Sequence, residues 1–565
     1  MVFRKRKTKN LFGLNYFVLT ILIFILFSFN SLIAQNKNQE ALRENKDNVS
    51  KVWVPDLGNG KYKNPIIFAD YSDPDVCRKG DDYYLVSSSF DAVPGLPVLH
   101  SKDLVNWTII AHALLKQPPF QNFSKPQHGN GVWAPAIRYH NNEFYIYYPD
   151  PDYGIYLVKA KDPAGPWSEP ILVQSGKGLI DPCPLWDDNG KVYLVHAYAG
   201  SRAGIKSILT INKLSEDGKK FLDEGVIVYD GHGTDPTIEG PKIYKRNGYY
   251  YIFAPAGGVS NGWQLVLRSK NIYGPYERRL VMKQGKTTIN GPHQGAWVET
   301  PKGESWFIHF SEKGAYGRVV YLEPMKWVDD WPVIGIDNND SGTGEPVYSY
   351  QKPDVGKTYP VAVPQTSDEF NSIKLGLQWQ WQANPEATWL FTSGEGYLRL
   401  YAIKLPDNFR NYWDVPNILM QKFPAEKFQA TTKLTFYPLQ DGDKTGFLVM
   451  GMDYSYLSLT KKEDGIYLSY TVCNHADKGD AEENKEIKKL TDSTVYLRVK
   501  IDTGAICHFS YSIDGNNFAG VGKSFIAKPG QWIGAKIGMF CSSTRKAHDS
   551  GFTDFDWFRI EQFNN

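Results

Sequence analysis

The stretch Thr234-Asp-Pro-Thr-Ile-Glu-Gly-Pro-Lys-Ile-Tyr-Lys-Arg-Asn-Gly-Tyr-Tyr-Tyr-Ile-Phe253 decides the fold of this 565-residue chain. Its carboxylate, Glu239, stands just before a short strand pattern that ends at Asn247-Gly248, and a second, aromatic strand pattern follows. An Asn-Gly pair between two such runs is the typical turn of a β-hairpin. The stretch therefore predicts a carboxylate where a hairpin strand begins.

The same pattern occurs four more times. Each copy leads through a polar turn to an aromatic strand, and the copies start at Asp73-Pro-Asp-Val76, Ala134-Pro-Ala-Ile137, Asp181-Pro-Cys-Pro-Leu-Trp186 and Gly295-Ala-Trp-Val298. The five aromatic strands begin near residues 83, 144, 192, 250 and 306. A spacing of roughly 50 to 60 residues lies within or just beyond the range that indicates a propeller or a solenoid, and units of short strands favour the propeller. The repeats predict a five-bladed β-propeller.

Three of the five repeats carry an acidic residue where the first strand begins: Asp73, Asp181 and Glu239. The innermost strands of a propeller surround one central channel, so equivalent positions of different blades face one another. We therefore expect the three carboxyl groups to share one small pocket. Each acid alone also has a structural explanation, because Asp accepts backbone hydrogen bonds in turns and Pro is tolerated at the first position of a strand.

The chain after the repeats follows a different pattern. Turn formers and prolines are frequent between residues 335 and 366, and alternating strand patterns without an acid-Pro motif follow, as at 428–436, 494–500 and 555–560. Evenly patterned strands predict an antiparallel β-sandwich. The fold class is thus all-β, a five-bladed β-propeller followed by a concanavalin-like antiparallel β-sandwich. The predicted bounds are a signal peptide at 1–34, a flexible lead-in at 35–60, the propeller at 61–350, a linker at 351–366 and the sandwich at 367–565.

The first 34 residues have the pattern of a secretory signal. Five basic residues between Arg4 and Lys9 precede an apolar run from Tyr16 to Phe29, and a small-residue cleavage pattern ends at Ala34. The apolar run is short for a membrane span, which leaves a signal anchor as the weaker alternative. We expect a periplasmic or secreted protein with no membrane association after the signal is removed.

Charge and cysteine usage exclude other classes of protein. Removal of the five basic residues of the signal changes the formal net charge from +2 to −3, and no basic run remains that could bind nucleic acid. The five cysteines are odd in number and widely scattered. They predict buried thiols and neither a disulfide framework nor a zinc site.

Converging carboxyl groups suit the cleavage of glycosidic bonds. Mutual repulsion and burial beside aromatic side chains raise the pKa of one acid, so that one carboxyl is protonated near neutral pH while another is ionised. Glycoside hydrolysis requires such an acid and such a base. Phe90 and Trp133 are candidates for a sugar platform at the same pole of the propeller, and packing between blades explains either one equally well.

Several of these motifs together resemble glycoside hydrolase family 43, a family of five-bladed propeller enzymes that includes β-xylosidases and α-L-arabinofuranosidases. The likeness covers residues 64 to 350, about half of the chain. It rests on Asn64-Pro65, Ser72-Asp-Pro-Asp75, Ser101-Lys-Asp-Leu-Val-Asn-Trp107, Gly131-Val-Trp-Ala-Pro135, Asp181-Pro182, Glu239-Gly-Pro241 and Tyr273-Gly-Pro-Tyr276. The domain after residue 366 resembles the β-sandwich that often follows the propeller in xylosidases of this family.

The resemblance implies a role for each acid. Asp73 matches the general base that activates water, Glu239 matches the general acid that protonates the leaving oxygen, and Asp181 matches the third acid, which orients Glu239 and raises its pKa. Such an enzyme inverts the anomeric configuration, which implies a separation of roughly 6.5 to 9.5 Å between the carboxyl groups of Asp73 and Glu239. Asp75 is a competing candidate for the base, but the Asp-Pro register shared with Asp181 favours Asp73.

Two further residues enter through the resemblance. Arg318 matches an arginine that reaches the pocket in many members, although an exposed strand arginine explains it equally well. His293 matches an axial histidine that helps to hold a calcium ion or water in the channel of some members. Calcium prefers about six or more oxygen ligands, so a single histidine predicts no metal. No cofactor is required by the expected chemistry, and Ca2+ stays an open alternative.

The expected activity is the exo-acting release of terminal xylose from plant or algal oligosaccharides and polysaccharides, as in a β-xylosidase. An α-L-arabinofuranosidase or a bifunctional enzyme is the first alternative. A carbohydrate-binding propeller without catalysis is an alternative from another class. The sandwich either binds sugar or packs on the propeller and narrows the mouth of the pocket.

Overall fold

The structure is a computed structural model that describes residues 49–546 and 548–563. The predicted signal peptide, residues 1–34, lies outside the described residues, as does most of the predicted lead-in. Within the described ranges, no helix combines the length and the apolar character that a membrane crossing requires.

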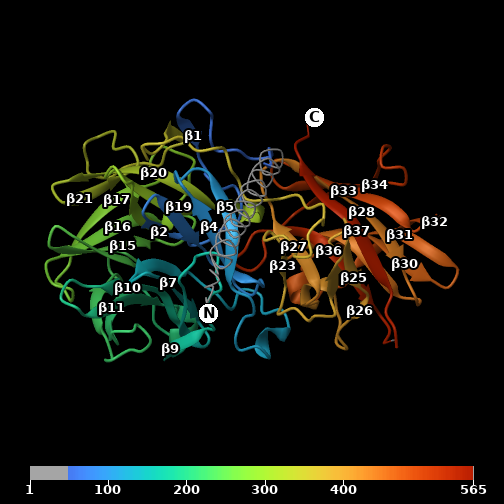
Figure 1. Cartoon of the computed structure of the whole chain (residues 1–565), viewed down its shortest axis with the longest axis horizontal. Helices are drawn as coiled ribbons and strands as arrows, with labels where there is room; N and C mark the ends of the chain where they lie inside the picture. The colour runs from blue at the N-terminus through green and yellow to red at the C-terminus, as the bar shows by residue number, and fades with distance from the viewer. Residues whose placement is uncertain (1–48, 547, 564–565) are drawn as a thin grey trace, which may run out of the picture. The chain divides into compact units, whose positions relative to one another are not determined.

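Five antiparallel four-stranded sheets follow one another along the chain and form the five predicted blades (Figure 1). In each blade the four strands pair in chain order. The blades are β2 (Asp75–Lys79), β3 (Asp82–Val86), β4 (Gly95–Ser101) and β5 (Trp107–Leu114); β6 (Ala136–His140), β7 (Glu143–Asp150), β8 (Gly154–Ala160) and β9 (Ile171–Ser175); β10 (Leu179–Trp186), β11 (Val192–Tyr198), β12 (Ile208–Leu214) and β13 (Val226–Asp230); β14 (Lys242–Arg246), β15 (Tyr249–Ala256), β16 (Trp263–Ser269) and β17 (Glu277–Lys283); and β18 (His293–Glu299), β19 (Ser305–Glu312), β20 (Arg318–Val328) and β21 (Trp331–Ile334).

The hairpin turns explain why the repeats could be recognised. Asn247 and Gly248 connect β14 to β15, and both have positive φ angles, of +49° and +76°. Asn141 and Asn142 connect β6 to β7 with φ angles of +48° and +62°. Two-residue turns with this geometry fit the twist of the flanking strands, and Asn and Gly adopt it most easily.

The two ends of the propeller are joined by backbone pairing. β1 (Lys61–Lys63) pairs antiparallel with β22 (Ser349–Gln351). Nδ2 of Asn64 also donates hydrogen bonds to the carbonyl oxygens of Leu322 and Val347, both at 2.9 Å. These contacts hold the first blade against the fifth.

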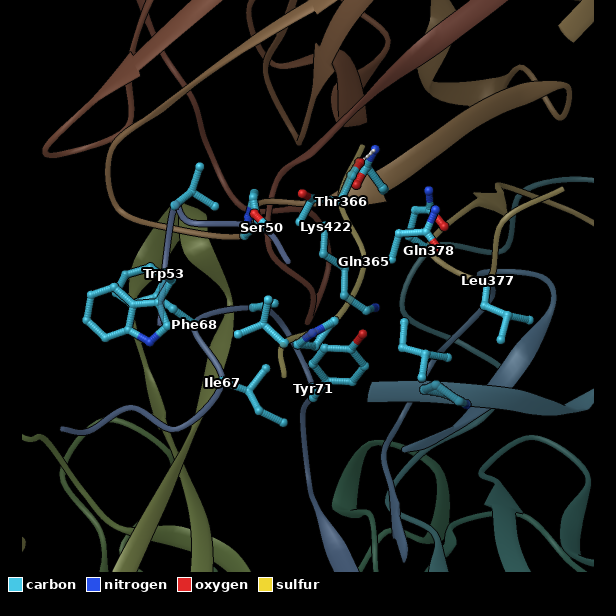
Figure 2. A pocket seen from close by; sticks show the side chains of 18 of the residues that line it. Ser50, Trp53, Ile67, Phe68, Tyr71, Gln365, Thr366, Leu377, Gln378 and Lys422 are labelled. Carbon is cyan, nitrogen blue, oxygen red and sulfur yellow. Dashed lines mark hydrogen bonds between the residues drawn. The ribbon is translucent and has the colours of Figure 1, made fainter. Parts of the chain in front are cut away.

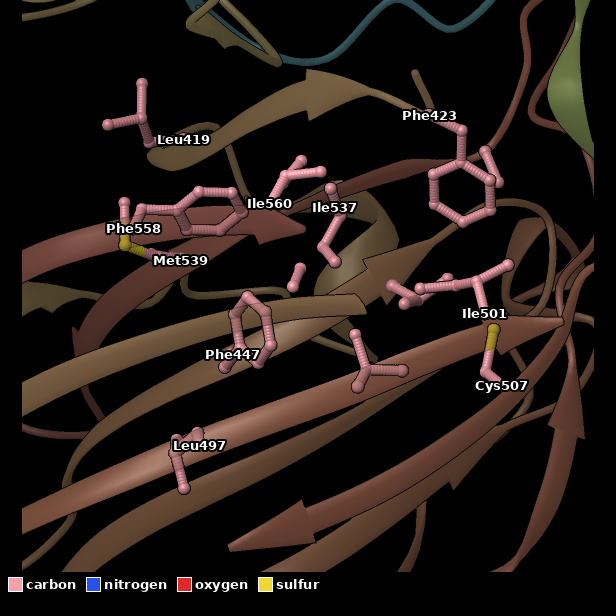
Figure 3. Close-up of a cluster of buried hydrophobic side chains, with 14 of the residues drawn as sticks. Leu419, Phe423, Phe447, Leu497, Ile501, Cys507, Ile537, Met539, Phe558 and Ile560 are labelled. Carbon is pink, nitrogen blue, oxygen red and sulfur yellow. The ribbon is translucent and has the colours of Figure 1, made fainter. Parts of the chain in front are cut away.

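The C-terminal domain is an antiparallel sandwich of two large sheets, as predicted (orange to red in Figure 1). Side chains from both sheets fill its core, among them Phe447, Leu497 and Phe558 (Figure 3). One sheet contains β23 (Gln380–Trp381), β27 (Ile418–Lys422), β36 (Lys536–Ser543), β29 (Asp443–Met450), β30 (Tyr454–Lys462), β31 (Gly465–Cys473) and β32 (Glu483–Leu490), with β26 (Ile403–Lys404) parallel to β36. The other contains β24 (Leu390–Thr392), β25 (Leu398–Tyr401), β37 (Phe552–Glu561), β28 (Phe428–Tyr437), β33 (Thr494–Asp502), β34 (Ile506–Ser512) and β35 (Ala519–Ile526).

In the part of the chain that the structure describes, helical structure is confined to short turns. They are η1 (Asn122–Ser124), α2 (Gly200–Ala203), η2 (Gly314–Tyr316), η3 (Tyr412–Asp414) and η4 (Ala476–Lys478). All five cysteines are buried free thiols, which confirms that they form no disulfide framework.

A cavity of about 50 Å³ lies where the first blade, the linker and the sandwich meet (Figure 2). Its lining combines apolar side chains such as Trp53 and Ile67 with polar ones such as Thr366, Gln378 and Lys422. None of the side chains that the sequence predicted for the catalytic site lines this cavity. It therefore belongs to the junction of the two domains and not to the predicted site.

Candidate active site

Asp73 and Asp181 share an unusual backbone conformation immediately before a proline. Their φ angles are +54° and +57°. This left-handed region is rare for residues other than glycine and costs about 1–3 kcal/mol per residue. Asp181 also lies where the pairing of β10 with β11 shifts register, between Ile180 and Cys183, and such bulges re-aim side chains next to active sites. The shared conformation supports equivalent positions for the two acids in their blades.

The carboxylate of Asp73 is buried and surrounded by donors. Its Oδ2 accepts hydrogen bonds from Oγ of Ser72 at 2.7 Å and from Oγ of Ser88 at 2.5 Å. Nη1 of Arg318 lies 3.4 Å from its Oδ1. These donors hold the carboxylate in a fixed orientation, as the position of a general base requires.

Asp75, the competing candidate for the base, has different partners. Its Oδ2 accepts hydrogen bonds from the backbone N–H of Ile137 at 2.7 Å and from Nη1 of Arg138 at 2.6 Å. Nη2 of Arg138 in turn lies 2.9 Å from Sγ of Cys183 in the third blade. Asp75 is completely buried, and its carboxylate forms an ion pair with Arg138. Through Arg138 and Cys183 this ion pair connects the first three blades.

Asp181 binds the backbone immediately after Glu239. Oδ2 of Asp181 accepts a hydrogen bond of 2.7 Å from the backbone N–H of Gly240, the neighbour of Glu239. Burial raises the pKa of Asp181 to about 8, and the carboxylates of Glu239 and Asp73 add to the rise. The ammonium of Lys242 and the N–H of Gly240 oppose it. The three acids therefore lie within electrostatic reach of one another.

His293, the first residue of β18, supports Glu239 from the fifth blade. Its Nε2 lies 2.9 Å from Oε1 of Glu239, and the imidazole is fully buried while 23% of the Glu239 side chain is exposed. This contact explains the position of His293 without a metal.

The donors near His293 do not fit a calcium ion. Across 49–546 and 548–563, no three His, Cys, Asp or Glu side chains are grouped to hold a metal. Lys242, fully buried nearby, adds a positive charge next to Asp181. Calcium prefers about six or more oxygen ligands, and no step below is assigned to it.

Arg318 is held in place from both domains. Its backbone N–H donates to Oδ1 of Asp70 at 2.9 Å, and the N–H of Gly534, in the sandwich, donates to Oδ2 of the same carboxylate at 2.9 Å. Gly317 has a φ of +76°, and a Cβ there would lie 2.5 Å from Asp70, so this turn requires glycine. The buried Asp70 therefore connects the sandwich to the arginine that contacts Asp73.

Three aromatic side chains form what we call the aromatic wall: Phe90, Trp133 and Trp532. The ring centroids of Phe90 and Trp133 are 6.4 Å apart, as are those of Trp133 and Trp532. The guanidinium of Arg318 lies 5.9 Å from the ring of Trp532, which joins the wall to Asp73. Phe90 is buried, whereas Trp532 keeps 48% of its surface exposed.

Two residues of this region escaped the sequence analysis. Trp532 belongs to the loop Gly530-Gln-Trp-Ile-Gly534 of the sandwich, and its flanking glycines were the only signal of an exposed loop. Lys242 follows Glu239-Gly-Pro, where a lysine stands among the apolar residues expected of an inner strand. Neither pattern by itself points to chemistry.

The arrangement combines one carboxyl group among hydroxyl and guanidinium donors, that of Asp73, with a second, that of Glu239, held by His293 and next to Asp181. A water molecule activated by the first and a leaving oxygen protonated by the second are the two requirements of glycoside hydrolysis with inversion. Arg318 and the aromatic wall add a cation and apolar faces, both of which suit a sugar ring.

Comparison with known proteins agrees with this chemistry. Residues 62–332 match the family described as glycosyl hydrolases family 43, and residues 367–561 match the β-xylosidase C-terminal concanavalin A-like domain. A protein of Xylanibacter ruminicola is 40% identical over 499 residues, which are 86% of this chain and 88% of that protein. The β-xylosidase of Formosa agariphila is 35% identical over 554 residues, 90% of this chain and 91% of that protein.

A solved structure extends the likeness to the whole fold. The xylan β-1,4-xylosidase of Bacillus halodurans C-125 superposes with a TM-score of 0.78 at 25% identity, over 88% of this chain and all of that one. The match includes both domains, because it leaves only about a tenth of this chain uncovered.

Proposed function

Because the chain belongs to glycoside hydrolase family 43, and is therefore a glycosidase, we propose that it is an exo-acting, inverting β-xylosidase. It would release terminal xylose from oligosaccharides and polysaccharides of plants or algae. The observation that carries the proposal is the geometry of the three acids: Asp73 lies buried among hydroxyl and guanidinium donors, and the buried Asp181 binds the backbone next to the partly exposed Glu239.

The mechanism follows from this geometry. Asp73 accepts a proton from a water molecule, whose oxygen attacks the anomeric carbon from the face opposite to the leaving group. Glu239 gives its proton to the glycosidic oxygen as the bond to the anomeric carbon breaks. Asp181 and His293 position Glu239, and Arg318 holds Asp73 and adds positive charge beside the sugar. Each turnover leaves Asp73 protonated and Glu239 ionised, and solvent restores both.

The sandwich supports exo action. Its loop brings Trp532 to Trp133 and Arg318, and Gly129 has no room for a Cβ because Gln531 and Trp532 lie 2.5 and 3.0 Å from that position. A site walled by two domains on one side accepts the end of a chain more easily than its middle. This contact favours the packing role of the sandwich over independent sugar binding.

The alternative within the same chemistry is an α-L-arabinofuranosidase, since xylopyranose and arabinofuranose present similar hydroxyl patterns. We propose to separate the two with nitrophenyl β-xyloside, nitrophenyl α-L-arabinofuranoside, xylobiose and arabinan, each with wild-type protein and the Glu239→Gln variant. The proposal predicts that kcat/KM is highest on the xylosides and is lost in the variant. Intact substrates throughout, with retained binding, would instead show a carbohydrate-binding propeller.

We also propose that the enzyme is exported through residues 1–34 and acts in the periplasm or outside the cell. The n-region, the apolar run and the cleavage pattern at Ala34 support this. Amino-terminal sequencing of the protein from its native host would begin at or near Gln35 if the signal is cleaved there.

A further inference from the structure

The turn immediately before Glu239 departs from ordinary turn chemistry. The backbone N–H of Ile238 donates a hydrogen bond of 3.1 Å to the carbonyl oxygen of Asp235, so Asp235-Pro-Thr-Ile238 forms a four-residue turn. Thr237, at its third position, has a φ of +59°. Proline at the second position and a positive φ at the third are features of a type II turn, whose third residue is usually glycine or asparagine. A threonine therefore occupies a glycine position two residues before the proposed general acid.

Thr237 is exceptional among the left-handed residues of the structure. Of the residues other than glycine that have a positive φ in the described ranges, it alone has a branched Cβ. A β-branched side chain in this region of backbone conformation is a genuine outlier. Such residues persist only where the surrounding structure determines their conformation, and they cluster at active sites. The contacts around the turn should therefore hold it firmly.

Asp235, the first residue of the turn, is anchored by side chains of three strands. Its carboxylate is fully buried. Nε and Nη2 of Arg278 in β17 donate hydrogen bonds to Oδ2 and Oδ1 at 2.6 and 2.5 Å. The hydroxyl of Tyr229 in β13 donates to Oδ2 at 2.5 Å, and Nε1 of Trp263 in β16 donates to Oδ1 at 3.2 Å. Each carboxylate oxygen thus accepts two hydrogen bonds, and the donors belong to the third and fourth blades.

The middle of the turn is held by the same two blades. The backbone N–H of Thr237 donates a hydrogen bond of 2.8 Å to Oγ of the buried Ser207, just before β12. Nζ of Lys206 lies 3.4 Å from the hydroxyl oxygen of Thr237. The carbonyl oxygen of Pro236 accepts a hydrogen bond of 2.8 Å from the N–H of Gly257, just after β15. These contacts fix the backbone of the turn on both sides.

The turn leads directly to Glu239. Ile238, the last residue of the turn, is buried in the core that the third and fourth blades share. The backbone N–H of Glu239 donates to the carbonyl oxygen of Pro255 at 3.2 Å, and its carboxyl lies 2.9 Å from His293. Because only Ile238 separates Thr237 from Glu239, a change in the φ of Thr237 would rotate the backbone that carries the acid.

We propose that Asp235 and Thr237 are positioning residues for the general acid: the anchored Asp235 fixes the turn, and the left-handed Thr237 points the carboxyl of Glu239 toward the leaving oxygen. The inference rests on the proposed function, because only a general acid needs this orientation. Neither residue touches the substrate in this scheme. Glycine would fit the turn without strain, but it is also the residue that restricts the backbone least, and a threonine gives a more rigid turn.

The test compares Asp235→Asn and Thr237→Gly with wild type on two substrates. Xylobiose has a poor leaving group and needs the acid, whereas dinitrophenyl β-xyloside has a leaving group that departs without protonation. A misplacement of about 1 Å can lower a rate about 10²-fold. We expect kcat on xylobiose to fall about tenfold or more in Asp235→Asn and about fivefold or more in Thr237→Gly, with kcat on the dinitrophenyl substrate within about twofold of wild type.

Two further readouts separate positioning from a merely structural role. The loss should fall on kcat and leave the KM for xylobiose nearly unchanged, because the proton is transferred only in the transition state. Thr237→Gly should unfold at the same temperature as wild type or a higher one, because glycine adopts a positive φ without strain. A variant that is as stable as wild type but less active on xylobiose alone does not owe its loss to the fold.

Each variant has a matched control. Asp554→Asn breaks another pair of this kind, in which Nε and Nη2 of Arg399 donate to the Asp554 carboxylate at 2.7 and 2.9 Å within the sandwich. Asn142→Gly introduces glycine at another positive φ, of +62°, in the turn between β6 and β7. Both controls should keep the wild-type ratio of the two activities. A lowered ratio in either control would show that the effect is not specific to this turn, and would overturn the inference.

The outcomes distinguish this inference from the proposed function. Equal losses on both substrates, or wild-type kcat on xylobiose in either variant, would overturn the positioning role and leave the β-xylosidase proposal intact. A wild-type protein that cleaves neither substrate would overturn both. Should Asp235→Asn fail to fold, Thr237→Gly decides by the same readouts.

Discussion

Trp532 tests whether the sandwich takes part in substrate binding. About half of its indole, 48%, is exposed beside Trp133 and Arg318. If a sugar ring covers one face, it removes roughly 60 Å² of apolar surface from water, which at about 25 cal/mol per Å² is about 1.5 kcal/mol. Since about 1.4 kcal/mol is a factor of ten, Trp532→Ala should lower kcat/KM on xylobiose about tenfold.

The assay is steady-state kinetics on xylobiose, with kcat and KM resolved separately, and thermal unfolding of the same samples. Trp557→Ala is the control, because Trp557 of β37 contacts Tyr496 and Arg559 within the sandwich itself. A Trp532→Ala enzyme whose kcat/KM stays within twofold of wild type would refute the reasoning. The sandwich would then act by packing alone.

Three further predictions concern the acids. Glu239→Gln should lower kcat on xylobiose about 10²- to 10⁴-fold, the usual contribution of a general acid, and a smaller loss would remove Glu239 from that role. Asp75→Asn should destabilise the protein by about 3–5 kcal/mol in urea unfolding, because it breaks the 2.6 Å ion pair between Arg138 and a fully buried carboxylate. Asp73→Asn removes only the 3.4 Å contact with Arg318 and should abolish turnover with a smaller loss of stability. The reverse result would make Asp75 the base. The pKa of Asp181 is about 8 in the folded state, whereas the ordinary pKa of this group is 3.8. Between these pH values the folded state keeps the proton and the unfolded state loses it, so rising pH favours the unfolded state. Asp181→Asn removes this effect, and its Tm relative to wild type should be higher at pH 8 than at pH 5; an equal difference at both values would contradict the raised pKa.

The propeller was predictable because its signals are local. The turn residues Asn247-Gly248 and Asn141-Asn142 adopt positive φ angles that few other residues tolerate, so they mark each hairpin in the sequence. The aromatic strands repeat at a spacing that only consecutive blades produce. The sandwich was predictable as a domain, but its strand order joins segments far apart in sequence, such as β28 and β37, and no local signal gives that order.

The site was predictable only in part for the same reason. Asp73 and Asp181 stand at equivalent positions of a repeat, each with a positive φ angle before a proline, so symmetry predicts that they lie close together. In the fourth repeat Gly240 takes that position and Glu239 precedes it by one residue, an offset that the sequence pattern did not reveal. Trp532 reaches the site through the docking of a second domain, which depends on Asp70 and Gly534 and leaves no periodic trace. Lys242 stands at the start of an inner strand, and only the structure shows that its side chain is fully buried there.

The most direct test of the account is the anomeric form of the first sugar released, followed by proton NMR from the moment of mixing with xylobiose. Hydrolysis by one water, activated by Asp73 while Glu239 protonates the departing oxygen, predicts that α-xylose appears first and that the β-anomer grows only by mutarotation. If β-xylose appears first, the reaction proceeds through a covalent intermediate, and the assignment of Asp73 as a base is contradicted.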